Sequence, residues 1–217
     1  PMVGTAFVLA RKMKESGDTL RFEVPAGLVT VRLIRRDAAV EGAVIEAPQP
    51  LTLGVQIPAE EIAESIGIAP SEIVVGNHVP TLASVGNTYV IAEVTERGLE
   101  GALPSLAVFQ RILESHAGLN GRFSLYLYSR RENVLSARMF APIVGTREDP
   151  ATGSAATPLA ALLLSLSGRE RDRYEIHQGV RMGRPSLLAT EAWRATDGIR
   201  ASVGGTCVAV LKGTATL

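Results

Sequence analysis

Hydrophobic residues follow one another almost without a break at residues 159–166, a stretch that shows no polar face at a spacing of 3.6 residues. A helix that is apolar on all sides is normally enclosed by protein. Even with its flanks, this stretch is shorter than the roughly 20 residues that a bilayer-spanning helix needs. We therefore predict a central, buried helix here and no membrane span.

Most of the remaining chain has β-branched or alternating apolar residues between Gly, Pro and charged breaks, which is typical of strands. The strands predicted in this way cover residues 28–34, 42–47, 73–75, 87–94, 123–129, 134–140, 199–203 and 206–212. Two further helices are predicted. One covers residues 58–68, with Pro and acids in its first turn, and the other covers residues 104–118, with Ser105 as its cap and a Gly stop.

A short pattern occurs twice along the chain. "PMVGTAFVLARKM" at the start matches "PATGSAATPLAAL" at residues 150–162, as Pro-x-x-Gly-[Ser/Thr]-Ala before an apolar stretch. At a similar distance after each copy, "FEVPAGLV" at 22–29 matches "YEIHQGVR" at 174–181, each predicted as an aromatic-Glu-aliphatic strand that reaches a Gly. Two matches in the same order suggest two halves that are built alike.

From this repeat we predict an α+β fold of two pseudo-symmetric, mixed β-barrel-like halves, each wrapped around a central helix. The halves are expected at residues 1–103 and 104–217, and the last strand can return to the first half. The second copy has two predicted strands ahead of its Pro-x-x-Gly, whereas the first copy has none before Pro1. We therefore expect the first half to be truncated at its N-terminus.

Composition and charge narrow the classes of function. The 217 residues are 46% hydrophobic, so the chain can bury a sizeable core, and Lys plus Arg equals Asp plus Glu at 22 each. Without a basic excess, we do not expect a nucleic acid as partner. Cys207 is the only cysteine and the three histidines are scattered singly, so the sequence indicates no disulfide, no metal site and a reducing, cytoplasmic compartment.

The candidate chemistry lies just ahead of the apolar helix, in "EDPATGSA" at residues 148–155. Unpaired N–H groups at a helix start carry the positive end of the helix dipole. Thr152, Gly153 and Ser154 could therefore hold a carboxylate or oxyanion of a small ligand. Asp149, one turn earlier, could exchange or orient a proton, which is acid–base chemistry that needs no metal.

A structural interpretation of the same residues is that Asp149, Thr152 or Ser154 only caps the helix. Thr157 and Pro158 also form a good cap and first-position pair, which would place the helix start later. Acids ahead of helices are common and active sites are few, so the pattern alone favours capping over catalysis. Glu148 is interpreted as a surface or strand-end charge.

Several stretches together resemble one known family. "RMFAPIVGTREDPATGSAATPLAALL" at 138–163, "AGLVTV" at 26–31, "QGVRMGRPSLL" at 178–188 and the closing "VGGTCVAVLKG" are similar to the phenazine-biosynthesis PhzF-like family. The wider superfamily includes diaminopimelate epimerase. The resemblance implies two mixed barrels around central helices, with an active site in the cleft between the two helix starts. It also implies a homodimeric, cofactor-independent isomerase that acts on a small carboxylated metabolite.

The resemblance carries over to individual residues only in part. It implies that Asp149 is the motif acid, that Gly153 and Ser154 supply the amides, and that the opposing helix start contributes Val3, Gly4 and Thr5. The acid/base of the family is a glutamate ahead of a Gly-His-Pro, and this chain begins at that Pro. The glutamate and the histidine are therefore expected to lie outside this sequence.

Two hypotheses follow from these observations. The first is an isomerase or epimerase that moves a proton between carbons, with Asp149 as an orienting partner. The two-thiol chemistry of diaminopimelate epimerase is not expected, because Cys207 matches neither of its cysteines. The alternative is a catalytically incompetent fragment, or a non-enzymatic small-molecule-binding protein, on the same fold.

Overall fold

The computed structural model describes residues 2–13 and 17–213 of the chain, and it confirms the predicted α+β class. Its helices are α1 (Met2–Lys12), α2 (Ala59–Ser65), α3 (Glu96–Gly101), α4 (Leu106–Ser115) and α5 (Gly153–Ser167). Its strands are β1 (Thr19–Val24), β2 (Gly27–Arg36), β3 (Ala39–Glu46), β4 (Thr52–Gln56), β5 (Thr81–Ser84), β6 (Thr88–Glu93), β7 (Leu125–Arg131), β8 (Val134–Ala141), β9 (Thr146–Asp149), β10 (Arg171–Gln178), β11 (Ser186–Ala195) and β12 (Gly198–Thr206).

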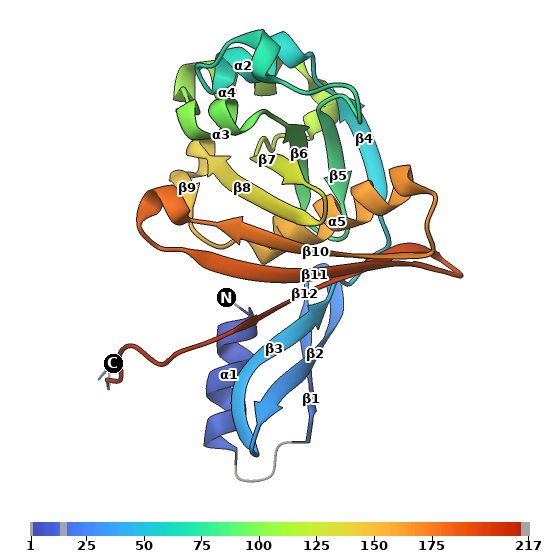
Figure 1. The fold of residues 1–217 in the computed structure, drawn as a ribbon, viewed down its shortest axis with the longest axis vertical. Coiled ribbons are helices and arrows are strands. Elements are labelled where there is room, and N and C mark those ends of the chain that lie inside the picture. Colours follow the sequence, from blue (N-terminus) through green and yellow to red (C-terminus); the bar gives the residue numbers. More distant parts are fainter. Residues whose placement is uncertain (1, 14–16, 214–217) are drawn as a thin grey trace.

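All described strands belong to one 12-stranded sheet in the order β1-β2-β3-β12-β11-β10-β8-β7-β6-β5-β4, with β9 added to β8. Neighbouring strands are antiparallel, except for the pairs β6–β7 and β8–β10. The sheet is strongly curved, and β12 connects its two parts by pairing with β11 on one side and β3 on the other (Figure 1). A single strand therefore runs through both halves of the molecule.

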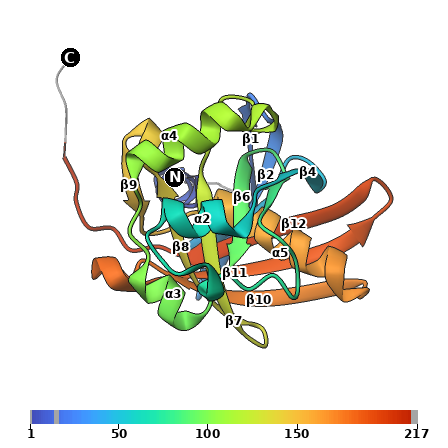
Figure 2. The same ribbon diagram turned by 90° about the horizontal axis from the view of Figure 1, so that it is seen from above.

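The larger half encloses α5. Strands β4 to β8 and β10 to β12 surround this helix in both views (Figures 1 and 2), and every residue from 155 to 164 is buried. Leu and Ala occupy all sides of the helix, so it packs against protein all round. The predicted central helix is confirmed here, although Leu166 at its end is half exposed.

The smaller half consists of α1 and the strands β1 to β3. Ala6, Phe7 and Ala10 of α1 are buried against the sheet, whereas Val8 and Leu9 lie on its exposed side. The helix therefore covers one face of a three-stranded sheet and is itself covered on one side only. The two halves share a helix-on-sheet plan but differ in how far the sheet encloses the helix.

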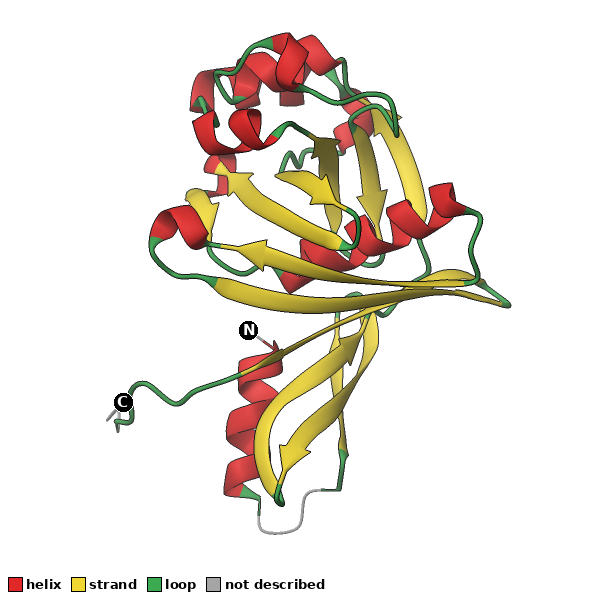
Figure 3. Ribbon diagram, viewed as in Figure 1, coloured by secondary structure: helices red, strands yellow, loops and turns green. Residues whose placement is uncertain are grey.

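Helices α2, α3 and α4 form an outer layer on the larger half, at the end farthest from α1 (Figure 3). Ile62 of α2, with Phe109 and Ile112 of α4, joins a second core with the strands β6 and β7. This layer covers the face of the strands that points away from α5. Most of β5, β6 and β7 is thus buried on both faces, whereas β10 and β11 alternate buried and exposed residues.

Between the two halves, β3 and β12 approach very closely. A Cβ added to Gly42 would lie 2.1 Å from the carbonyl oxygen of Gly205, and one added to Gly204 would lie 2.9 Å from Val44. No larger side chain fits at Gly42, because the obstacle is backbone and cannot rotate away. Backbone contact therefore sets the spacing of these two strands.

The structure differs from the sequence-based strands in several places. The predicted strand at 206–212 is wrong, because the chain leaves the sheet after Thr206 and forms no strand through residue 213. Residues 73–75 make only one isolated bridge, between Ile73 and Val94. Strands β4, β5, β9 and β11 were not predicted, because they are short, charged or rich in Ala and Glu, which weakens the strand pattern.

The pairing of β6 with β7 brings together segments from both sides of residue 103. The division of the chain at that residue remains a prediction, and the structure adds that strands on both sides of it share one sheet.

Over the part of the chain that the structure describes, no helix is long and apolar enough to cross a membrane.

Candidate active site

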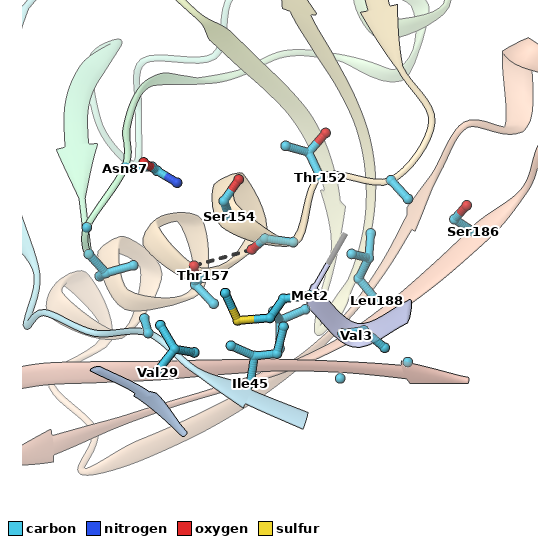
Figure 4. A pocket seen from close by; sticks show the side chains of 18 of the residues that line it. Met2, Val3, Val29, Ile45, Asn87, Thr152, Ser154, Thr157, Ser186 and Leu188 are labelled. Atoms are coloured by element: carbon cyan, nitrogen blue, oxygen red, sulfur yellow. Dashed lines mark hydrogen bonds between the residues drawn. The ribbon is translucent and has the colours of Figure 1, made fainter. Parts of the chain in front are cut away.

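A cavity of about 800 Å³ lies at the start of α5, between the two halves. One wall comes from the smaller half and includes Met2, Val3 and Ile45, and the opposite wall includes Leu188 and the first turn of α5 (Figure 4). The lining is mostly apolar. Among the described residues that line it, Asp149 is the only charged side chain. Asp149 is half-buried and supplies the negative charge of this lining.

The start of α5 faces this cavity with unpaired amides. Thr152 is the N-cap residue, but no side chain accepts a hydrogen bond from the first turn. The N–H groups of Ala155 and Ala156 bond to the Thr152 carbonyl, whereas those of Gly153 and Ser154 have no partner among the described residues. Two donors and the positive end of the helix dipole are thus available to an anionic group of a ligand.

Gly153 also brings the helix start close to β12. A Cβ at this position would lie 3.1 Å from Cγ1 of Val203, which is a tight contact. The absence of a side chain lets the first turn of α5 pack against the strand that connects the two halves. Predicted site residues Thr152, Gly153 and Ser154 therefore lie together at one wall of the cavity.

Asp149 ends β9 and also lines the cavity. Its Oδ2 accepts a hydrogen bond of 2.6 Å from Oγ1 of Thr152, so the Thr152 hydroxyl points toward the acid and not toward the helix amides. The capping interpretation is wrong for these side chains. The later helix start is wrong too, because Thr157 and Pro158 lie inside α5.

Ser154 bonds to a residue that the sequence did not single out. The hydroxyl groups of Tyr89, on β6, and Ser154 are 2.7 Å apart. Burial raises the pKa of Tyr89 above its ordinary value, and the charge of Asp149 adds to that rise. The phenol therefore stays neutral over the physiological pH range and can share its proton with Ser154.

A buried glutamine supports the loop between Asp149 and Thr152. Gln178, the last residue of β10, is fully buried and bonds to both residues and to the hydroxyl of Tyr126. A signal for it exists in the sequence. Tyr174, Ile176 and Gln178 alternate on the buried face of β10, so a polar residue occupies an apolar position of the pattern.

Glu148 lies next to the end of β9, as a strand-end charge would, but its side chain is not on the surface, which corrects the other part of the interpretation. Its carboxylate accepts two hydrogen bonds of 2.8 Å from Arg138, and only 16% of its side chain is exposed. Arg138 also donates to the carbonyls of Leu99 and Ala102, at 2.9 Å each. The pair fastens β9 to β8 and to the segment after α3, and so holds the strand that carries Asp149.

The opposing helix start contributes less than the resemblance implied. Met2 and Val3 line the cavity, whereas Gly4 and Thr5 are not among its lining residues, and Thr5 is exposed.

Cys207 lines the cavity just after β12, and burial raises the pKa of its thiol. Within residues 2–13 and 17–213, no group of three or more His, Cys, Asp or Glu side chains could hold a metal ion.

The whole chain is similar to a known family and to several named proteins. The profile of the "Phenazine biosynthesis-like protein" family matches residues 1–213. The trans-2,3-dihydro-3-hydroxyanthranilate isomerase of Pseudomonas chlororaphis is 30% identical over 225 residues, which cover 100% of this chain and 73% of that protein. An uncharacterized isomerase of Mesorhizobium japonicum is 31% identical over 200 residues, covering 88% of this chain and 66% of its own length.

Among solved structures, a predicted epimerase from Pseudomonas aeruginosa superposes with a TM-score of 0.74 at 25% identity. The match covers 99% of this chain and 74% of that one. The chain thus spans about two thirds to three quarters of the length of these proteins.

Proposed function

The chain belongs to the family of phenazine biosynthesis-like proteins, and we propose that it is a cofactor-independent isomerase within that family. The proposed reaction moves a proton on a small carboxylated metabolite bound in the cavity at the start of α5. Relatives named as isomerases support the reaction class. The observation that carries the proposal is the pair of unpaired amides at Gly153 and Ser154 beside the lone acid Asp149.

The geometry suggests how the substrate is held. A carboxylate that accepts hydrogen bonds from the Gly153 and Ser154 amides is stabilised by the dipole of a helix whose body is wholly buried. A ligand that covers the largely apolar lining would displace water and so strengthen this interaction. No lysine, arginine or histidine is found among the described lining residues, so the helix start is the anion-binding element of this cavity.

The chemical step needs a base that removes a proton from carbon, while the electron pair spreads toward the bound carboxylate. The family resemblance gives the role of base to a glutamate expected outside this sequence, and Asp149 is proposed as its partner. Charge that develops there is stabilised by donors already in place, which is the usual source of such rate enhancement. A proton returned at a different carbon gives the isomer, with no change in oxidation state. Asp149 exchanges or orients this proton, and Ser154 with Tyr89 supplies hydroxyl donors nearby.

A deuterium experiment tests the proposal. The chain is incubated in D₂O with trans-2,3-dihydro-3-hydroxyanthranilate, and substrate and product are read by mass spectrometry. We expect an isomer that carries deuterium at one carbon, or none if the proton is transferred directly, and no effect of a chelator. A requirement for zinc or for a reduced cofactor contradicts the proposal.

The variant Asp149→Asn sharpens this test. It keeps the size of the side chain and an oxygen that can accept from Thr152, but it removes the charge. The rate should fall by about 10² or more, with a much smaller change in melting temperature. Equal losses of rate and stability would assign Asp149 a structural role.

The alternative is a binding protein on the same fold, and one observation favours it. Asp149 is the only carboxylate among the described lining residues, so a carboxylate pair that could pass a proton between two carbons is not found among them. This alternative predicts that calorimetry detects binding of the same carboxylate while no isomer and no deuterium exchange are found. Binding together with exchange contradicts it.

A further inference from the structure

Gln178 is the most completely bonded polar side chain near the cavity. Its amide makes four hydrogen bonds and is fully buried. The nitrogen donates to the carbonyl of Asp149 at 2.7 Å and to Oγ1 of Thr152 at 2.9 Å. The oxygen accepts from the amide of Thr152 at 3.1 Å and from the hydroxyl of Tyr126 at 3.0 Å. Every donor and acceptor of the amide is therefore used.

Two backbone partners fix which way this amide points. The carbonyl of Asp149 can only accept, so it must face the NH₂ group, and the N–H of Thr152 can only donate, so it must face the oxygen. A flipped amide would place like groups against each other at both contacts. The orientation of Gln178 thus follows from chemistry and not from a choice between similar atoms.

This orientation determines the direction of the next hydrogen bond. Because the second N–H of Gln178 donates to Oγ1 of Thr152, the Thr152 hydroxyl hydrogen must point elsewhere. Its partner is Oδ2 of Asp149, at 2.6 Å. Oδ2 is then an acceptor, while Oδ1 accepts no hydrogen bond from the described residues and stays available to a ligand.

From this network we propose that Gln178 is a positioning residue for the isomerase reaction. It fixes the donor direction from Thr152 to Asp149, so that Oδ2 is always occupied and Oδ1 is the oxygen that meets the substrate. The inference rests on the proposed function, because it says which carboxylate oxygen of Asp149 contacts the substrate of the proposed isomerase. Gln178, which orients Asp149 in this way, lies on β10, outside the motif at residues 148–155.

Two variants of Thr152 test the proposal without replacing the buried amide itself. Thr152→Ser keeps the hydroxyl, and Thr152→Val keeps the shape but removes it. On trans-2,3-dihydro-3-hydroxyanthranilate, Thr152→Val should lower kcat about tenfold to a hundredfold with KM changed less than about threefold, because a hydrogen bond to a charged group is lost. Thr152→Ser should restore kcat to within about threefold of the parent.

Thr190→Val is the matched control. Thr190 is buried in the same half, and its hydroxyl donates to the carbonyl of Tyr174 at 3.1 Å, away from the cavity. Its loss should lower the melting temperature and leave kcat unchanged. If Thr152→Val loses no more activity than Thr190→Val, the proposal is overturned.

Gln178→Glu tests the amide directly, because it keeps the shape but removes both N–H donors. We expect a loss of kcat at least as large as in Thr152→Val. A Gln178→Glu protein that folds and retains the parent kcat also overturns the proposal. If this variant does not fold, the two Thr152 variants still decide the question.

Neutron diffraction of the deuterated parent protein provides a test that needs no turnover. We expect deuterium on Oγ1 of Thr152, directed at Asp149, and two deuterium atoms on the Gln178 nitrogen. Deuterium on Oδ2 of Asp149, directed at Thr152, overturns the proposed polarity. If the expected positions are found but no carboxylate is isomerised, the proposed function fails and the hydrogen-bond polarity stands.

Discussion

The two halves of the molecule begin from the same local sequence pattern and reach different environments. Both α1 and α5 begin within a Pro-x-x-Gly-[Ser/Thr]-Ala segment, α1 at Met2 and α5 at Gly153, yet α5 is buried on every side while α1 is covered on one. The pattern therefore marks the neighbourhood of a helix start and not its first residue. The side chains after it determine how much of the helix protein can cover, and α1 ends on Arg11 and Lys12, which favour water.

The two halves also contribute different kinds of groups to the cavity lining. The α5 half supplies the hydrogen-bonding groups, including Asp149, Thr152 and Ser154, each held by a bond to a buried or half-buried partner. The α1 half supplies apolar surface, including Met2 and Val3. We infer that chemistry belongs to the half whose helix is enclosed and that substrate shape is selected by the more exposed half.

The largest expected effect comes from breaking a buried ion pair of the α5 half. Arg138→Met removes one partner of a buried ion pair and leaves Glu148 without compensation, so the free energy of unfolding should fall by about 3–5 kcal/mol. Chemical denaturation measures this loss. The control is Asp18→Asn in the α1 half, which breaks an exposed pair with Arg35 and should cost less than about 1 kcal/mol. Similar losses in both variants would show that the halves do not differ in this way.

The next effect compares the two helices directly. Leu159 of α5 is fully buried, so Leu159→Ala should lower the free energy of unfolding by about 2–5 kcal/mol. Leu9 of α1 is 38% exposed, and Leu9→Ala should change stability by no more than about 0.5 kcal/mol. Thermal and denaturant unfolding measure both values. A costly Leu9→Ala would mean that the open side of α1 is covered in solution.

A smaller effect should separate shape from chemistry. Met2→Ala enlarges the cavity from the α1 side, and we expect KM to rise about tenfold with kcat within about twofold of the parent. Ser154→Ala removes a hydroxyl from the α5 side and should lower kcat by about tenfold with KM little changed. Steady-state kinetics measures both variants. The reverse assignment, with Met2→Ala acting on kcat, contradicts the division of roles.

The smallest effect is a pH dependence at the far end of α5. Burial works to raise the pKa of Asp172, but hydrogen bonds from Arg169, Ser167 and Tyr174 outweigh it, so the pKa is lowered below the ordinary 3.8. A lowered pKa stabilises the fold above the unfolded value, and this stabilisation is lost as pH falls through the folded value.

The parent should therefore exceed Asp172→Asn by about 1 kcal/mol near neutral pH, because a charged acceptor bonds more strongly than an amide. The difference should shrink below pH 3.8. Denaturant titrations at several pH values measure it. A difference that stays constant with pH would show that the charge of Asp172 is not what stabilises the strand.

Periodicity predicted the parts of the fold that are decided locally. The uniform apolar run identified α5, and the unpaired amides at Gly153 and Ser154 follow from where that helix begins. The family resemblance at residues 148–155 is confirmed by the match over residues 1–213. These features depend on neighbours in sequence, which a single chain displays.

The supporting side chains could not be predicted in the same way. Tyr89 and Ser154 are 65 positions apart in the chain, and Tyr126 and Gln178 are 52 apart. Their meeting depends on the strand order, which pairs β6 with β7 and β8 with β10 in parallel. The pattern of a single strand does not show which distant residue a polar side chain will contact. It shows only that Gln178 occupies a position of β10 where the alternation calls for an apolar residue.

The glycine contact between β3 and β12 has a consequence for how such a protein can diversify. Because Gly42 meets the backbone of Gly205, the gap between the two walls of the cavity is set by main chain. Side chains on the α1 wall can then be exchanged over evolutionary time without moving the acid on the opposite wall. The same backbone can in this way bind a series of differently shaped substrates. Homologues would then diverge in substrate specificity sooner than in the type of reaction.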